Sequence, residues 1–285
     1  TTMGNLTAVV TTDSVPSGSA VEVATVVPVV TSNTAHLAPN ATTLTINGFG
    51  FDTTAGNNTV TFNNGAVGAV TAATATSLTV TFSTDPTALG SLTAVVTTNS
   101  VSSGAAVQVA TVAPVVTSST SSLAANATTV TINGVGFDTT AAHNTVTFND
   151  GAVGTVTAAT STSLTVTFST KPKTAGSLTA VVTTNGVSSG SAVQVATVTP
   201  VVTASSASLL ASASTITITG FGFDPTAAHN TVVFNDGAVG TVSAATATSL
   251  TVTFSTKPTS TGSLTAVVTT DSLSSGSAVQ VATVT

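Results

Sequence analysis

A ten-residue segment ending in Gly-x-Gly-Phe-Asp occurs three times in the chain at a constant spacing. The copies are TLTINGFGFD at 43–52, TVTINGVGFD at 129–138 and TITITGFGFD at 215–224. Their last phenylalanines follow one another at intervals of 86 residues. Within each copy apolar residues alternate with Thr or Asn, which is the pattern of a half-buried β-strand. We therefore expect consecutive small β domains, each built around one copy.

Two glycines and a phenylalanine end each of these strands. Glycine tolerates the positive φ of a bulge or sharp turn, and such a turn would return the Phe ring to the core. The residues of this predicted structural motif are Gly48, Gly50, Phe51, Gly134, Gly136, Phe137, Gly220, Gly222 and Phe223.

Other residues share the same period and predict the domain boundaries. Pro28, Pro114 and Pro200 are in register, so complete repeats are expected at 28–113, 114–199 and 200–285. Residues 1–27 match the closing part of a preceding repeat. A lone two-stranded hairpin is only marginally stable in water, so this segment should pack against something. We favour further repeats before it in a longer chain, over completion of a neighbouring subunit.

Seven short strands are predicted in the repeat 114–199, with essentially no helix. They are a first strand from Pro114 and then 127–133, 144–148, 152–157, 163–168, 177–184 and 192–198. The turn Asn149-Asp150-Gly151 predicts a hairpin between the third and fourth strands. Seven strands with regularly spaced turns predict an antiparallel β-sandwich. Strand alternation predicts the inward-facing set, namely Val130, Ile132, Phe137, Val146, Phe148, Val156, Leu164, Val166, Phe168, Leu178, Ala180, Val182, Val193 and Val195.

The sequences of the junctions predict stiff connections between the repeats. The segments VATVAPVV at 109–116 and VATVTPVV at 195–202 contain no Gly, no Ser and no charge, whereas flexible linkers are rich in Gly and Ser. The expected fold class is therefore all-β, with tandem sandwiches in an extended rod on the order of 120 Å long.

Composition excludes several classes of protein. The chain has 3 basic and 9 acidic residues, with a net charge of −6. Nucleic-acid binding needs Lys and Arg patches, so no nucleic-acid partner is expected. The apolar runs are too short for a membrane span, so we expect no membrane insertion in this segment. No Cys is present, which excludes disulfides, cysteine-ligated zinc and thiol catalysis. Only 4% of residues are charged, against about 25% in ordinary domains, so neighbouring chains or glycans are expected to cover part of the surface.

The repeat resembles the IPT/TIG group of immunoglobulin-like domains. The resemblance is carried by Pro114 at the repeat start, VTINGVGF at 130–137, NTVTFNDGAV at 144–153 and GSLTAVVTTNGVSSG at 176–190. It covers all three repeats. It implies an immunoglobulin-like sandwich, and tandem copies without basic residues resemble the use of this domain in bacterial surface proteins.

No catalytic set or cofactor-binding motif emerges from the sequence. His143 and His229 share one repeat position, with Asp150 and Asp236 further on, but the first repeat has Asn57 there. Both His are interpreted as loop residues. The aspartates after the motif Phe are interpreted as turn caps, with calcium as the alternative, and they are Asp52, Asp138 and Asp224. Because only one acid recurs and calcium needs several oxygen ligands, no metal and no cofactor are expected.

Four asparagines lie in Asn-x-Ser/Thr sequences and are candidate N-glycosylation sites. They are Asn5, Asn40, Asn57 and Asn126. Unmodified Asn is the alternative, because a Thr-rich chain generates such sequences by chance.

These observations predict a non-enzymatic structural segment of an extracellular or cell-surface fibre, filament or stalk. Its expected partners are neighbouring repeats or copies of itself, together with glycans. Two alternatives remain open: an adhesin-type module that recognises glycans or another cell, and spacer domains of a larger secreted enzyme.

Overall fold

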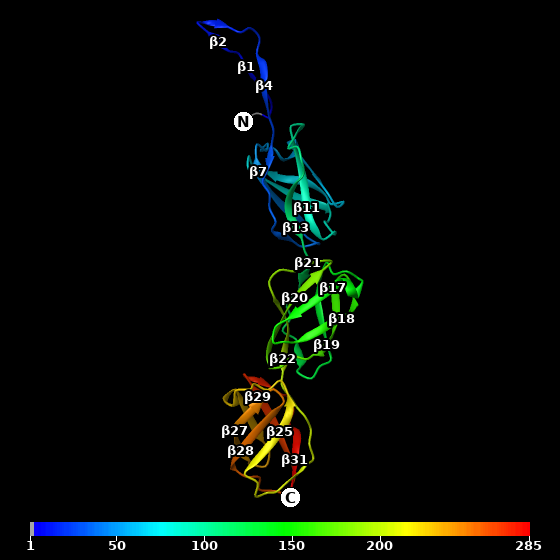
Figure 1. The fold of residues 1–285 in the computed structure, drawn as a ribbon, viewed down its shortest axis with the longest axis vertical. Coiled ribbons are helices and arrows are strands. Elements are labelled where there is room, and N and C mark those ends of the chain that lie inside the picture. Colours follow the sequence, from blue (N-terminus) through cyan, green and yellow to red (C-terminus); the bar gives the residue numbers. More distant parts are fainter. Residues whose placement is uncertain (1–2) are drawn as a thin grey trace. The chain divides into compact units, whose positions relative to one another are not determined.

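The computed structural model describes residues 3–285, which form β-strands and three single-turn 3-10 helices (Figure 1). The predicted all-β immunoglobulin-like fold is confirmed. The chain consists of two compact units, 1–115 and 116–285, and most contacts between residues lie within one unit or the other. None of the helices among residues 3–285 has the length and apolarity required to cross a bilayer.

The first unit holds a hairpin followed by one sandwich. In the hairpin, β1 (Gly4–Ala8) pairs antiparallel with β4 (Val21–Val26), and β2 (Thr11–Thr12) pairs with β3 (Val15–Pro16). In the sandwich, one sheet has the order β5-β7-β10-β9, and the other has the order β12-β11-β13-β6 with β8 also on β11. Its elements are β5 (Val29–Val30), β6 (His36–Leu37), β7 (Thr43–Phe49), η1 (Ala55–Asn57), β8 (Asn58–Phe62), β9 (Val67–Ala73), β10 (Ser77–Thr84), β11 (Gly90–Thr98), β12 (Val101–Ser102) and β13 (Val107–Val112).

The second unit holds two sandwiches of the same topology. The first has the sheets β14-β16-β19-β18 and β15-β22-β20-β17, and the second has β23-β25-β28-β27 and β24-β31-β29-β26. β21 and β30 are short additional strands on β20 and β29. The elements are β14 (Val115–Val116), β15 (Ser122–Ala124), β16 (Thr129–Val135), η2 (Ala141–His143), β17 (Asn144–Phe148), β18 (Val153–Ala159), β19 (Ser163–Thr170), β20 (Gly176–Thr184), β21 (Val187–Ser188), β22 (Val193–Thr199), β23 (Val201–Val202), β24 (Ser208–Leu209), β25 (Thr215–Phe221), η3 (Ala227–His229), β26 (Asn230–Phe234), β27 (Val239–Thr246), β28 (Ser249–Thr256), β29 (Gly262–Thr270), β30 (Leu273–Ser274) and β31 (Val279–Val284).

The first predicted strand of the repeat, from Pro114, is shortened to β14, and it is followed by β15, a strand that the sequence did not predict. β14 lies beside β16, whereas β15 crosses to the other sheet and pairs with β22 in parallel. The same short parallel pairing joins β6 to β13 and β24 to β31. Each sandwich is therefore antiparallel except for this one pair. The crossing satisfies backbone groups at an edge of both sheets, which one straight strand would not do.

The hairpin predicted at Asn149-Asp150-Gly151 is wrong, although the turn itself forms. Asp150 and Gly151 have φ of 56° and 66°, and the Ala152 amide donates to the Asn149 carbonyl at 3.3 Å. The strands on either side belong to different sheets, because β17 pairs with β20 and β18 pairs with β19. The turn is a corner between the two sheets, and Asn149 Nδ2 donates to the carbonyl of Ser177 in β20 at 2.9 Å.

In the second repeat, every second strand residue is buried, as the sequence predicted, until a β-bulge interrupts this alternation. Of the predicted inward set, all are buried except Val146 and Val193, which are half-buried and pack against the same cluster. The register shifts between Leu178 and Thr179, so the facing strand buries Val195 and Ala196 in succession and then Val198. A bulge inserts one residue and so inverts the alternation beyond it.

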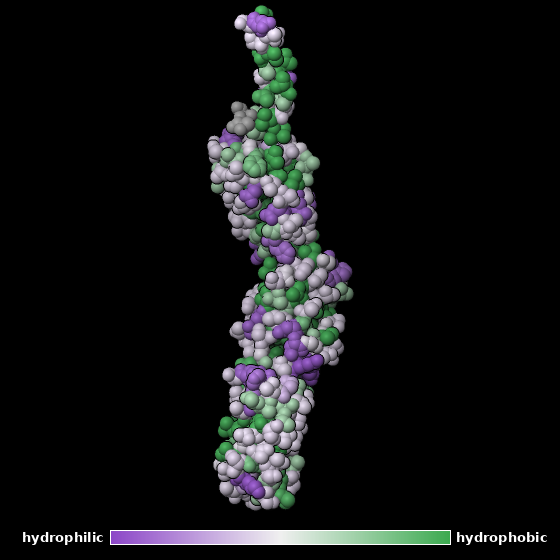
Figure 2. Space-filling model, turned by 60° about the vertical axis from the view of Figure 1, so that its left-hand side comes forward, coloured by the Kyte–Doolittle hydropathy of each residue, from purple (hydrophilic) through white to green (hydrophobic). Residues whose placement is uncertain are grey.

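The surface is poor in charge and is largely made of small polar side chains. The face seen in Figure 2 is mostly pale, with scattered hydrophilic groups, and the N-terminal hairpin is largely green. On that hairpin the exposed apolar side chains are Leu6, Val9, Val10, Val15, Val21 and Val23. In the first complete repeat, Leu92, Ala94 and Val96 stand at the positions of Leu6, Ala8 and Val10, and all three are buried.

Candidate functional site

One end of each sandwich gathers the polar and titratable side chains that the sequence placed in separate loops. In the second repeat the loop between β16 and β17 meets the turn between β20 and β21, where the Asn185 amide donates to the His143 carbonyl at 2.9 Å. The same backbone bond joins Asn99 to Asn57 at 2.9 Å and Asp271 to His229 at 3.1 Å. We call this place the apical cluster of each repeat.

A buried asparagine forms the base of the apical cluster. Asn144 is 4% exposed, and its Oδ1 accepts from the Asp138 amide at 3.1 Å and from Thr184 Oγ1 at 2.9 Å. Its Nδ2 donates to the carbonyls of Asp138 at 2.8 Å and Thr140 at 3.1 Å. Every polar atom of this side chain has a partner, so the loop is fixed on the sandwich.

The carboxylate of Asp138 lies above this base. Its Oδ1 accepts from the Thr140 amide at 2.7 Å, and its Oδ2 accepts from Asn185 Nδ2 at 2.9 Å. His143 Nδ1 lies 3.2 Å from the same Oδ2. These donors, with Asn185 first, favour the ionised form and hold the pKa of Asp138 well below its ordinary value.

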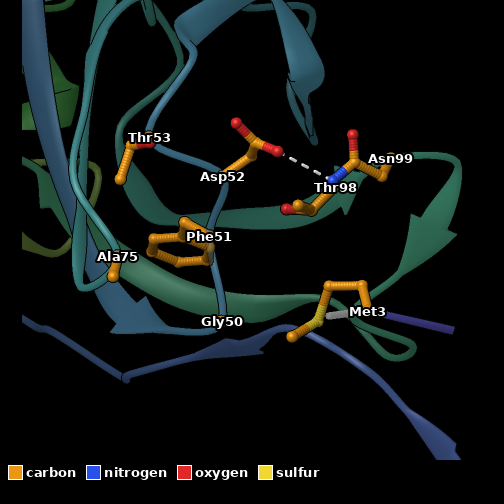
Figure 3. Close-up of a pocket in the computed structure, with 8 residues that line it drawn as sticks. All are labelled: Met3, Gly50, Phe51, Asp52, Thr53, Ala75, Thr98 and Asn99. Atoms are coloured by element: carbon orange, nitrogen blue, oxygen red, sulfur yellow. Dashed lines mark hydrogen bonds between the residues drawn. The ribbon is translucent and has the colours of Figure 1, made fainter. Parts of the chain in front are cut away.

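The first repeat builds the same arrangement without a histidine. Asn99 Nδ2 donates to Asp52 Oδ2 at 2.9 Å, as the dashed line in Figure 3 shows. Of the groups that lower the pKa of Asp52, this hydrogen bond from Asn99 has the largest effect. Beside it is a hollow of about 440 Å³, lined by Met3, Gly50, Phe51, Asp52, Thr53, Ala75, Thr98 and Asn99.

The third repeat differs at one position, where Asp271 replaces the bridging asparagine. His229 Nδ1 lies 3.3 Å from Asp224 Oδ2 and 3.4 Å from Asp271 Oδ1. The Thr226 amide donates to Asp224 Oδ1 at 2.6 Å. This hydrogen bond has the largest effect in lowering the pKa of Asp224. The three side chains offer one nitrogen and two carboxylate oxygens within 4.8 Å of one another.

The strand that leads into each apical cluster ends in the glycine motif. Phe51, Phe137 and Phe223 are buried, and the ring of Phe223 lies against the α-carbon of Gly220, where a Cβ would collide with it. The second glycines, Gly50, Gly136 and Gly222, have φ of 75°, 80° and 77°, a conformation that glycine adopts without strain.

This combination of a glycine turn, a buried aromatic ring and two facing sheets agrees with the family comparison. The family model described as IPT/TIG domain matches residues 28–110 and 114–198, which is more than half of the chain. The chain belongs to the IPT/TIG domain family. The resemblance noted from the sequence is thereby confirmed.

The IPT/TIG repeats have low sequence identity and low TM-scores to several solved structures. A comparison with curated protein sequences gives no match. Among solved structures, a Bacteroides ovatus glucan-utilisation protein, SGBP-B, is 18% identical over 92% of this chain and 69% of its own, with a TM-score of 0.25. Invasin, a bacterial integrin-binding protein, is 16% identical over 89% of this chain and 59% of its own, with a TM-score of 0.27. The Escherichia coli adhesin FdeC is 14% identical over 91% and 96%, with a TM-score of 0.22.

The IPT/TIG sandwich brings each histidine to an aspartate other than the one considered from the sequence. His143 lies at Asp138, whereas Asp150 accepts from the amides of Lys173 at 2.7 Å and Thr174 at 3.0 Å. Sequence reasoning therefore missed the apical cluster. The available signal was the constant five-residue separation of Asp138 from His143 and of Asp224 from His229.

The candidate N-glycosylation sites lie on the surface of the IPT/TIG repeats. Asn5, Asn40, Asn57 and Asn126 are all exposed. Asn57 belongs to the apical cluster of the first repeat, and Asn5 Nδ2 donates to Glu22 Oε2 at 2.6 Å. Their modification stays a prediction.

Proposed function

We propose that these IPT/TIG repeats form a non-catalytic structural segment of an extracellular or cell-surface fibre, filament or stalk. In this proposal the repeats 28–113, 114–199 and 200–285 are spacers of one length, preceded at 1–27 by the closing hairpin of another repeat. The observation that carries the proposal is a packed joint between the second and third repeats, one feature of which recurs beside the first repeat.

The joint within the unit 116–285 uses the glycine motif of the third repeat. The Ala175 amide donates to the Gly222 carbonyl at 3.0 Å, and Thr174 forms an isolated parallel bridge with Gly222. Phe221 packs against the core cluster of the second repeat, and Lys171 Nζ lies 5.4 Å from the centre of its ring. A backbone hydrogen bond, an apolar contact and a cation–π contact together resist swivelling at this junction.

The unit 1–115 repeats one feature of this joint, the close approach at the second glycine of the motif. Met3 occupies the repeat position of Ala175, two periods earlier. A Cβ at Gly50 would come within 2.8 Å of Met3 Cε, and a Cβ at Gly222 would come within 2.6 Å of Ala125 Cβ. The second glycine of the motif therefore allows close contact with the preceding repeat in both units. This recurrence supports a stiff string of repeats, which would appear as an extended rod.

Small-angle scattering of the full chain tests the stiffness. The matched variant carries a short Gly-Ser insertion after Thr199, where the β22 ladder ends. The wild type should give a larger and better-defined maximum dimension than this variant, because a Gly-Ser linker samples many orientations. Indistinguishable profiles would overturn the proposal of a stiff joint.

Self-association and glycan attachment complete the proposal. The charge-poor surface and the exposed apolar side chains of the N-terminal hairpin favour contact with a further repeat or a second copy. Electron microscopy of native material should show filaments with a spacing tied to the repeat. Intact mass spectrometry should show added sugar at the exposed sequons; an unmodified mass would overturn glycosylation alone.

A second function, an adhesin-type binding module, is favoured by one observation. Equivalent hollows lie beside the apical clusters of the first and third repeats, with volumes of about 310 Å³ and 340 Å³. The lower end of the size range of small-molecule pockets is about 300 Å³. Glycan-array binding that is lost when Thr97 and Thr269 of these hollows are changed to bulky residues would support this function over a purely structural one.

A further inference from the structure

The apical cluster of the third repeat brings together three metal-ligating side chains, whereas the corresponding positions of the other two repeats hold fewer. Asp224, His229 and Asp271 stand where the second repeat has Asp138, His143 and Asn185. The first repeat has Asp52, Asn57 and Asn99 at these positions. The donor set is thus one imidazole nitrogen and two carboxylate oxygens in the third repeat only.

Two of the three distances between the donor atoms match the coordination sphere of a small divalent metal, and the third is at most 4.8 Å. Ligands at 2.0–2.1 Å in a tetrahedron lie about 3.3–3.4 Å from one another. His229 Nδ1 is 3.3 Å from Asp224 Oδ2 and 3.4 Å from Asp271 Oδ1. We propose that Asp224, His229 and Asp271 bind a divalent first-row transition metal such as Zn²⁺.

Electrostatics distinguishes this repeat from its neighbour. In the second repeat Asn185 Nδ2 donates a hydrogen bond to Asp138 Oδ2 at 2.9 Å. Asp271 has no amide N–H to donate to Asp224, so the two carboxyl groups share the imidazole of His229 as their bridging group. A bound cation relieves the repulsion between the carboxylates, because it attracts both of them.

The ligands are held in place and remain accessible. The Thr226 amide binds Asp224 Oδ1 at 2.6 Å and leaves Oδ2 directed at His229. Hydrogen bonds of this kind orient a metal ligand. The side chains of Asp224, His229 and Asp271 are 19%, 53% and 41% exposed. Next to them is the hollow of about 340 Å³ lined by Ala228, His229, Thr231, Thr269, Asp271 and Ser272, which leaves room for water ligands.

The chemical nature of the three donor atoms indicates which class of metal ion fits the site. Calcium prefers six to eight oxygen ligands, whereas imidazole with carboxylate suits zinc, nickel and related ions. Three protein ligands with an open position are a common zinc arrangement. This assignment differs from the sequence-based expectation of no metal, because Asp271 is 47 residues from Asp224 and no local motif joins them.

Calorimetric titration of the full chain with Zn²⁺, in a non-chelating buffer at pH 7, tests the site. The repeats supply matched variants. Asp271→Asn gives the third repeat the residues of the second, and Asn185→Asp gives the second repeat the residues of the third. Asp13→Asn is the control, since Asp13 holds the same repeat position in the N-terminal hairpin, where no histidine accompanies it.

The wild type should bind one Zn²⁺ per chain. Asp271→Asn should weaken that binding by about tenfold or more, Asn185→Asp should add a second equivalent, and Asp13→Asn should change neither. Circular dichroism establishes that each variant is folded. An undetectable wild-type signal, binding unaffected by Asp271→Asn, or preference for Ca²⁺ over Zn²⁺ would each overturn the assignment.

Discussion

The side-chain oxygen of Asn144 accepts a hydrogen bond of 2.9 Å from the hydroxyl of Thr184, which lies 40 positions further along the chain. Both residues are buried, at 4% and 0% exposure. The same pair recurs as Asn58 with Thr98 and as Asn230 with Thr270, also at 2.9 Å. This buried contact ties the loop of the apical cluster to the neighbouring strand in every repeat.

Asn144→Ala should destabilise the second repeat by about 3 kcal/mol, because buried donors and acceptors around it lose their partners. Urea unfolding followed by far-ultraviolet circular dichroism measures this, since the chain has no Trp or Tyr. The exposed Asn126→Ala is the matched control and should stay within about 0.5 kcal/mol of the wild type. A loss below about 1 kcal/mol for Asn144→Ala would contradict the structural role of this residue.

Phe223→Ala should destabilise the third repeat by about 3–5 kcal/mol, as expected for deletion of a fully buried ring. Phe223 is 0% exposed, whereas Phe49, on the strand just before the motif turn of the first repeat, is 62% exposed. Phe49→Ala therefore serves as the control and should have little effect on unfolding. Equal effects of the two substitutions would show that the motif Phe is not the centre of the core.

Stability should decrease as the pH falls below about 4, which is the pKa of an aspartate in an unfolded chain. Hydrogen bonds from Asn185, Thr140 and His143 lower the pKa of Asp138 in the folded state. The unfolded state therefore binds the proton first, and the stabilisation present above pH 4 is lost on acidification.

The substitution Asn185→Ala removes the strongest of these donors, so the stability of the variant should depend less steeply on pH. Urea midpoints between pH 6 and pH 2 measure the difference. An unchanged pH dependence would show that this amide does not control the ionisation of Asp138.

Ser272→Gly should stabilise the third repeat by about 0.5–1 kcal/mol, because glycine adopts positive φ without a steric cost. Ser272 has φ of 68° in the two-residue turn between β29 and β30, and Gly186 holds the same position in the second repeat with φ of 79°. The reciprocal change Gly186→Ser should destabilise by a similar amount. Thermal unfolding of both variants checks the prediction, and shifts of the same sign would refute it.

Particular residues show which features could be predicted from the sequence. The alternation around Ile132, Leu164 and Val182 predicted their burial, because a strand with one face on a core exposes every second residue. The bulge that buries both Val195 and Ala196 was not predictable in this way, since it depends on how two distant strands are aligned.

The turn at Asn149-Asp150-Gly151 illustrates the same limit. Its local conformation follows from the preference of these residues for positive φ. Which sheets its flanking strands join depends on the partners β19 and β20, which lie further along the chain.

By itself the sequence determined the repeat, the all-β class, the strand faces and the scarcity of charge, because each depends on residues close together in the chain or on composition. Only the tertiary structure decided the pairing of strands across sheets and the meeting of Asp224, His229 and Asp271. Those residues lie in two separate loops, and the β26–β29 ladder that joins the strands beside those loops brings them within reach of one another.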